Sequence, residues 1–186
     1  MRLPSVNVGD ATPLEGARKS GKTGIYKRPL RGPVEVLFGC LKADKISDKE
    51  NHGGPDQAAY VFGSPDYEWW SEALGRDLSP GTFGENLTVC GLESAAVCVG
   101  DRLGIGSAVL EVTAPRTPCL TLAVRMGDPV FSSGSGGRSG QACTAGSPGK
   151  ARSGRVIPWR TRRTPGSGCR CWRCSGLSSM GTREKK

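Results

Sequence analysis

The stretch Pro115-Arg116-Thr117-Pro118-Cys119 lies between a predicted strand, Val109-Leu110-Glu111-Val112, and a predicted helix. Thr117 can cap that helix, Pro118 suits its first position, and Gly127 ends it. Apolar residues at positions 120, 123 and 124 give the segment one apolar face. We therefore predict that a strand turns into a short helix here, with Cys119 in the first helical turn.

Cys119 is the residue of this chain best placed for reactive chemistry. Exposed amide groups at a helix N-terminus, together with the positive charge of Arg116, favour a thiolate at this position. A thiolate attacks electrophiles and binds soft metals. The alternative is a small buried residue that packs under the helix, because free cysteine is often buried.

The rest of the body is predicted to be mainly β, with short strands separated by glycine. Such spacing is typical of a barrel or a sandwich rather than a doubly wound sheet. One further helix is expected from Ser64, as its cap, to Gly75, with Tyr67, Trp70 and Leu74 on one face. The other predicted strands cover residues 3–8, 34–38, 86–89, 96–99 and 102–105.

Charge divides the chain into two parts. Residues 1–131 have 14 basic and 16 acidic side chains, a net charge of −2, whereas residues 132–186 have 12 and 1, a net charge of +11, which together give the total of +9. The second part has few aliphatic residues and many glycines, serines and arginines, so we expect a disordered tail. No segment reads as a signal peptide or membrane span, which predicts a cytoplasmic protein without a membrane partner.

Several short patterns in residues 6–131 resemble the MOSC domain family, named for the C-terminal domain of molybdenum cofactor sulfurases, in its small stand-alone bacterial branch. Each pattern is weak alone, but their order along the chain makes the match specific. The patterns are Thr23-Gly24-Ile25-Tyr26-Lys27, His52-Gly53-Gly54-Pro55-Asp56, Phe83-Gly84-Glu85-Asn86-Leu87-Thr88 with Gly91-Leu92, Val99-Gly100-Asp101-Arg102-Leu103 with Gly106, and Pro115-Arg116-Thr117-Pro118-Cys119.

The resemblance implies a MOSC-type β-barrel in which Cys119 is a ligand to molybdenum or carries activated sulfur. It further implies the molybdenum cofactor, a redox enzyme or sulfur carrier acting on a small-molecule substrate, reduction of N-hydroxylated compounds, and a reductase as electron donor. Descriptions of the family also mention pyridoxal phosphate, for which the residues offer no independent support. Asp44 occupies a usually acidic stretch, and Ala43 stands where members of the family tend to have glycine.

Four further residues are candidates for this site. A pterin cofactor carries a phosphate and a polar ring, so its pocket needs cationic and amide donors, which Lys27, Arg116 and Asn86 can supply. Lys27 can equally be a solvated charge, and Asn86 a turn residue that bonds nearby backbone. His52, the sole histidine, can donate to a cofactor or shuttle a proton, or it can brace its loop.

Beyond residue 131 the family-like sequence stops. Members of the family normally continue with further barrel strands, and these patterns are absent from the frame of this chain. Reading residues 139–147 and 154–160 from third codon positions permits both missing patterns. We therefore hypothesise a single-base insertion or deletion near codon 131, which would leave residues 1–131 as an incomplete barrel, exposed at its strand edges and of doubtful activity.

Two alternatives concern the tail itself. Its arginines together with Trp159 and Trp172 could bind nucleic acid, by neutralising phosphates and stacking on bases. We favour the cofactor reading, because the basic character begins where the family-like sequence ends. Cys169, Cys171 and Cys174 could bind zinc but lack a clear fourth ligand, so chance cysteines are the preferred reading.

Overall fold

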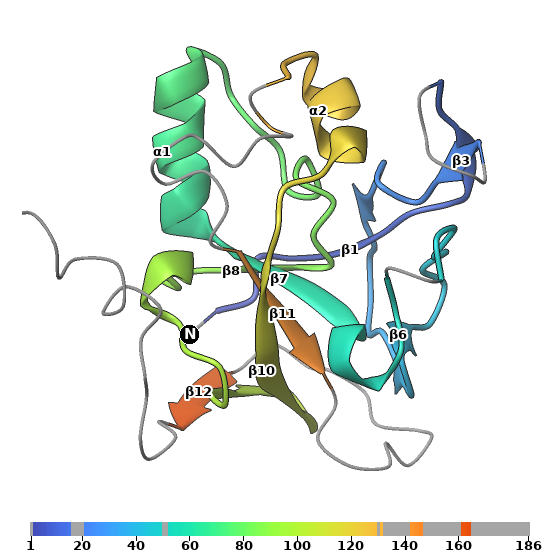
Figure 1. The fold of residues 1–186 in the computed structure, drawn as a ribbon. Helices are drawn as coiled ribbons and strands as arrows, with labels where there is room; N and C mark the ends of the chain where they lie inside the picture. The colour runs from blue at the N-terminus through green and yellow to red at the C-terminus, as the bar shows by residue number, and fades with distance from the viewer. Residues whose placement is uncertain are drawn as a thin grey trace, which may run out of the picture.

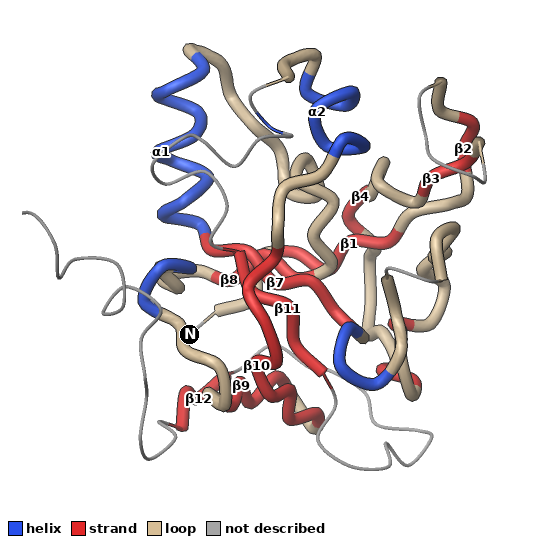
Figure 2. Tube along the Cα trace, viewed as in Figure 1, coloured by secondary structure: helices blue, strands red, loops and turns tan. Residues whose placement is uncertain are grey.

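The computed structural model describes residues 2–15, 21–49, 52–129 and 131, and the backbone of residues 142–146 and 161–164. Its centre is an eight-stranded sheet, with two small two-stranded sheets beside it (Figures 1 and 2). The large sheet has the order β12 (Thr161–Thr164), β9 (Arg102–Ile105), β10 (Ala108–Arg116), β11 (Ala142–Gly146), β7 (Ala59–Gly63), β8 (Leu87–Val89), β1 (Ser5–Val8) and β4 (Arg28–Pro29). The small sheets pair β2 (Thr12–Pro13) with β3 (Lys22–Thr23), and β5 (Val36–Leu37) with β6 (Cys40–Leu41).

The predicted β-rich fold class is confirmed, but the closed barrel is not. All neighbours in the large sheet are antiparallel except β7 and β8, which run parallel. The sheet has two ends, β12 and β4, and no pairing joins these ends within the described residues. A sheet with two free ends is open, so the described residues form no closed barrel.

The strands around the Gly106-Ser107 turn follow the sequence closely. Ile105 of β9 pairs with Ala108 of β10, as the alternation of apolar residues predicts. The strand predicted at residues 96–99 is wrong, because a 3-10 helix, Ser94–Ala96, occupies its start and an irregular segment follows it. The central strand β7 was not predicted from the sequence. It is buried at four of its five positions, so its apolar and polar residues do not alternate.

Both predicted helices are present and stand on the same side of the sheet (Figure 1). α1 (Ser64–Leu74) is capped by Gly63 rather than Ser64, and α2 (Leu120–Met126) by Cys119 rather than Thr117. Each helix ends at a glycine in the left-handed conformation, Gly75 and Gly127, as expected. Their inner faces share one buried cluster, made of Phe62, Tyr67, Trp70, Phe83, Ala123, Met126 and Phe131.

The prediction of a disordered tail is wrong at two segments. Ala142–Gly146 forms β11, which lies between β10 and β7, and Thr161–Thr164 forms β12 at the edge beside β9. The physical reason is that the facing edges of β7 and β10 offer unpaired backbone groups, which any extended segment can satisfy regardless of its apolar content. The remainder of the predicted tail, including the three cysteines considered as an alternative zinc site, lies outside the described residues. The hypothesis of a shifted reading frame stays a prediction.

Within the described part of the chain, neither helix has the length and apolar character needed to cross a membrane.

Candidate functional site

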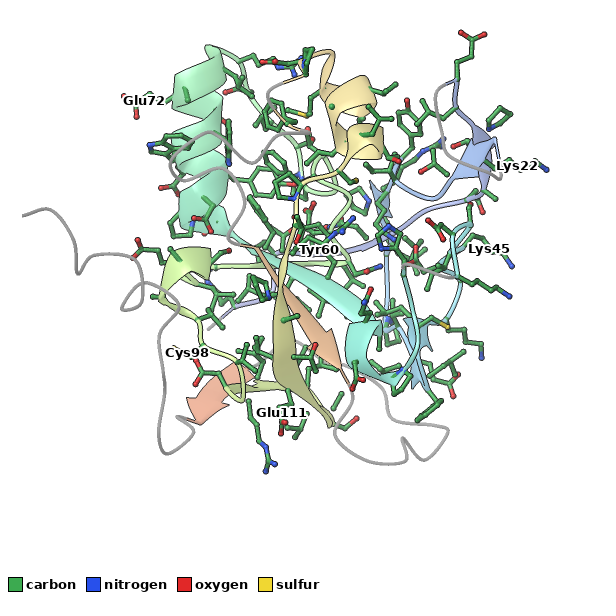
Figure 3. The ribbon with its side chains drawn as sticks, in the orientation of Figure 1. Lys22, Lys45, Tyr60, Glu72, Cys98 and Glu111 are labelled. Carbon is green, nitrogen blue, oxygen red and sulfur yellow. The ribbon has the colours of Figure 1, made fainter. Side chains whose placement is uncertain are left out.

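A cleft of about 920 Å³ opens beside the N-terminal end of α2. Its walls come from the segment around β3, the loop after β6, the 3-10 helix Pro55–Gln57 with strand β7, the loop before β8 and the passage from β10 into α2, together with Trp70 of α1 and Phe131. Figure 3 shows Tyr60 near the middle of the molecule below the two helices, with Lys22 and Lys45 on the side of β3. All five residues predicted for the site, Lys27, His52, Asn86, Arg116 and Cys119, line this one cleft.

Cys119 lies at the start of α2, and its free thiol lines the cleft. Its carbonyl oxygen accepts hydrogen bonds from the amides of Leu122 (3.0 Å) and Ala123 (3.1 Å), so Cys119 is the N-cap rather than a residue of the first turn. Cys119 is half-buried, so the alternative that it is a small buried residue packed under the helix is wrong. A thiol placed in this way is reachable from the cleft.

Arg116 connects Cys119 to the aromatic side of the cleft. Its Nη2 donates to Sγ of Cys119 at 3.7 Å, and its guanidinium carbon lies 5.7 Å from the ring centroid of Tyr60. A guanidinium stacked on a ring has little freedom to move, so its charge stays close to the sulfur. The positive charge predicted near Cys119 is therefore present, and Tyr60 holds it there.

His52 lies half-buried in the same cleft. Burial lowers the pKa of its imidazole, the positive charges of Arg116 and Lys27 lower it further, and Asp48 opposes them. His52 is therefore expected to be neutral at pH 7, a form that can accept a proton or a hydrogen bond. The backbone amide of His52 donates to the carbonyl of Asp48 at 3.1 Å, and this backbone hydrogen bond braces the loop.

Lys27 and Asn86 meet at one carboxylate. Nζ of Lys27 lies 2.6 Å from both oxygens of Asp44, and Nδ2 of Asn86 donates to Oδ2 of Asp44 at 2.9 Å. Asn86 also bonds to the carbonyl of Asn7 and to the amide of Tyr60, which ties β1 to β7. The interpretation of Lys27 as a solvated charge is wrong, because its side chain is only 9% exposed. Binding of a cofactor by these two residues stays a prediction.

The Phe83–Thr88 motif is organised by Glu85, which is fully buried. Its Oε1 accepts hydrogen bonds from the hydroxyls of Tyr67 (2.6 Å) and Thr88 (2.8 Å), the amide of Gly81 (2.6 Å) and the side chain of Asn7 (3.3 Å). Burial raises the pKa of the Glu85 carboxyl, and these hydrogen bonds oppose the shift. This network fixes the loop that supplies Phe83, Gly84 and Asn86 to the cleft wall.

Three residues important to this geometry were not among the predicted site residues. Asp44 was recognised only as part of an acidic stretch, although it holds two of the predicted residues. Tyr60 gave no signal, because strand β7 was not predicted. Arg125 ties α2 to the segment before β4, since its guanidinium donates to the carbonyl of Ile25 and lies 5.0 Å from the ring centroid of Tyr26.

A family model described as "MOSC domain" matches residues 48–162, which is more than half of the chain. The chain belongs to the MOSC domain family. The match contains His52, Asn86, Arg116 and Cys119, and it extends past residue 131 into the segment that includes β11. MOSC membership thus agrees with the resemblance seen in the sequence motifs.

Two curated proteins and several solved structures are similar to this MOSC chain. The uncharacterized protein YflK of Bacillus subtilis (strain 168) is 43% identical over 123 residues, which cover 66% of this chain and 56% of that protein. Protein YiiM of Escherichia coli (strain K12) is 32% identical over 104 residues, 54% of this chain and 46% of that protein. The chain therefore spans about half the length of the curated relatives it matches.

Among solved structures, YiiM from Geobacillus stearothermophilus superposes with a TM-score of 0.64 at 27% identity, covering 88% of this chain and 75% of that one. The YUAD protein from Bacillus subtilis gives a TM-score of 0.58 at 14% identity, covering 86% and 92%. The second likeness concerns the fold alone. Together they support a YiiM-like fold for this MOSC domain.

Proposed function

We propose that this MOSC domain binds a molybdenum cofactor in its cleft, with Cys119 as the protein ligand to the metal or as the carrier of activated sulfur. The observation that carries the proposal is a half-buried free thiol lining a cleft of about 920 Å³, with a guanidinium nitrogen 3.7 Å from the sulfur. Thiolate is a soft donor and suits such a metal. The cleft volume lies in the range that holds small-molecule ligands and cofactors.

The donor set fits a metal that arrives with ligands of its own. Within the described residues, no group of three or more His, Cys, Asp or Glu side chains could hold a metal ion. One thiol cannot complete a coordination shell, so an organic cofactor has to supply the remaining donors. Lys22, Lys45 and Arg116 give the same cleft cationic groups that suit a phosphate. Pyridoxal phosphate is not part of the proposal, because Lys27 is held in an ion pair.

Each side chain then has a distinct task. Arg116 places a positive charge 3.7 Å from the sulfur of Cys119, the atom proposed to bind metal or sulfur. Tyr60, Phe62 and Phe83 line the cleft and exclude water from its inner wall. Neutral His52 is available to take up a proton. The cofactor, when bound, would supply two-electron redox chemistry at its metal.

Molybdenum content tests the proposal directly. Parent protein, Cys119→Ser and Cys90→Ser are produced in cells with intact cofactor synthesis, and bound molybdenum is measured per folded protein. Cys90 is the matched control, a half-buried free cysteine that does not line the cleft. We expect molybdenum in the parent and in Cys90→Ser, and a loss of at least tenfold in Cys119→Ser. Equal molybdenum in all three would refute the proposal.

The redox and sulfur-carrier roles need a second measurement. Reduction of hydroxylamino purines and amidoximes is assayed with several candidate reductases as electron donors, using cofactor-loaded protein. Mass spectrometry of Cys119 then looks for an additional sulfur atom in protein isolated without reductant. Turnover without extra sulfur supports the redox role, and extra sulfur without turnover supports the carrier role. The nucleic-acid alternative has no support from the fold or from the relatives, and we do not propose it.

A further inference from the structure

Asp44 joins three segments that are far apart in the sequence. Besides its contacts to Lys27 and Asn86, its Oδ1 accepts a hydrogen bond from the amide of Gly9 at 2.9 Å. The carboxylate therefore bonds to the residue just after β1, the residue just before β4 and the residue just before β8. Its side chain is 3% exposed, so these contacts are shielded from water. Charged hydrogen bonds shielded in this way are stronger than those at a surface.

The backbone next to Asp44 is strained. Ala43 has a φ of 71°, the left-handed region that side chains other than glycine rarely adopt, and it is the sole such non-glycine residue in the described ranges. Strain of this kind persists where the surroundings impose it, and it gathers at functional sites. Here the surroundings include the bond from the Asp44 amide to the carbonyl of Leu41 (3.1 Å) and that from the Lys45 amide to Gly9 (2.9 Å). Asp44 is thus held in place at a cost to its neighbour.

We propose that Asp44 is the positioning residue of the cleft: its carboxylate fixes the Lys27 ammonium and the Asn86 amide at the polar wall. The ligand that this wall would contact rests on the function proposed above, whereas the positioning of Lys27 and Asn86 by Asp44 does not depend on it. Asp44 does not line the cleft, so it acts through the two residues that do. Its second task is electrostatic, because it supplies the counter-charge for a buried ammonium.

The charges around Lys27 show in which direction Asp44 shifts its pKa. Burial lowers the pKa of Lys27, and the positive charge of Arg125 adds to this, whereas Asp44 and, more weakly, Glu85 raise it. His52 lies within range as well, since Lys27 lowers the pKa of its ring. Asp44 is the largest of the groups that keep Lys27 protonated. Replacing it by a neutral residue leaves burial unopposed by this charge, so Lys27 should release its proton at lower pH.

Competitive labelling of amines tests this inference without any cofactor. Parent, Asp44→Asn and Asp101→Asn are labelled briefly with acetic anhydride between pH 6 and pH 11, and modification of Lys27 is quantified by mass spectrometry. Asp101 is the matched control, a buried aspartate that accepts a hydrogen bond from the amide of Cys98 and lies outside the cleft. We expect the midpoint for Lys27 to fall by about 1 pH unit or more in Asp44→Asn, the usual effect of losing a close opposite charge, and to stay unchanged in Asp101→Asn.

An unchanged Lys27 midpoint in folded Asp44→Asn would overturn the inference. If that variant does not fold, Asp44→Ser takes its place with the same expected fall in the Lys27 midpoint, and an unchanged midpoint in Asp44→Ser would likewise remove the claim. Molybdenum content separates the two proposals. If Cys119→Ser keeps its molybdenum, the proposed function fails while the labelling still decides the role of Asp44.

Discussion

Nη2 of Arg116 lies 3.7 Å from Sγ of Cys119, and the same guanidinium stacks over Tyr60. The first contact places a positive charge at the sulfur, and the second limits where that charge can move. β10 ends at Arg116 and α2 is capped by Cys119, so the geometry follows from a strand that passes into a helix within two residues. The reactivity of Cys119 should therefore depend on Arg116.

Arg116→Gln is expected to slow alkylation of Cys119 by iodoacetamide at pH 7.5. At 3.7 Å the lost charge is worth about 1 kcal/mol even when it is fully screened by water, which corresponds to about fivefold in the rate of attack by the anionic sulfur. Cys40 and Cys90 are free cysteines outside the cleft, and they serve as internal controls in the same digests. A rate at Cys119 that does not respond to the substitution would show that the two side chains are uncoupled.

The pKa of His52 should lie below the ordinary value of 6.5, because of burial first and of Arg116 second. His52 is the sole histidine of the chain, so its imidazole proton signals can be followed by NMR without assignment. Arg116→Gln should raise the midpoint towards 6.5. The unfolded chain binds the proton more readily, so the His52 contribution to stability is present above pH 6.5 and is lost as pH falls through the lower folded value. A parent midpoint at or above 6.5 would contradict this.

The site was more predictable from the sequence than the fold around it. Lys27, His52, Asn86, Arg116 and Cys119 belong to short motifs with local signatures, and the structure brings all five to one cleft. Asp44 was not assigned a role, because its partners lie 17 and 42 residues away and no local pattern reports such contacts. Short motifs therefore identify the residues that can carry out chemistry. The residues that hold them in place are determined by tertiary packing, which no short motif reports.

The strands show the same limit. β9 and β10 were predicted because they form a hairpin with alternating apolar residues. β7 is buried on both faces and β11 is made of small residues, so neither has the period of two that marks a half-exposed strand. The place of β11 is decided by the unpaired edges of β7 and β10, whose residues lie 26 to 86 positions earlier in the chain than the β11 residues they pair with. Pairing with strands so far away in the sequence cannot be recognised from a short segment of the chain.

Ala43→Gly is expected to stabilise the protein by about 0.5–1 kcal/mol. The left-handed conformation costs a side chain about 1–2 kcal/mol, and the greater entropy of glycine in the unfolded chain offsets part of the gain. Ala73, exposed in α1, provides the matched control, because Ala73→Gly should destabilise by about 1 kcal/mol. Denaturant unfolding measures both, and two changes of the same sign would argue against strain at Ala43.

Glu85→Gln should change how stability depends on pH. The pKa of Glu85 is raised by burial, so the folded state keeps a proton that the unfolded state releases above about pH 4.5. The corresponding stability is present below pH 4.5 and is lost as pH rises through the folded value. Relative to the parent, Glu85→Gln should therefore gain stability as pH rises above about 4.5. Glu85→Ala leaves the buried donors of Tyr67, Gly81 and Thr88 without their acceptor. The free energy of unfolding should therefore fall by about 3 kcal/mol or more at any pH.

A chain that ends at residue 131 should be much less stable than the full chain. β11 pairs with five residues of β10 and three of β7, and removing it exposes the facing edges of both strands. Buried donors and acceptors without partners cost about 1–3 kcal/mol each, so we expect a loss of at least about 3 kcal/mol together with aggregation. A chain that ends at residue 164 keeps β11 and β12 and is the control. Equal melting temperatures for the chain ending at residue 131 and the full chain would mean that β11 contributes nothing to the sheet.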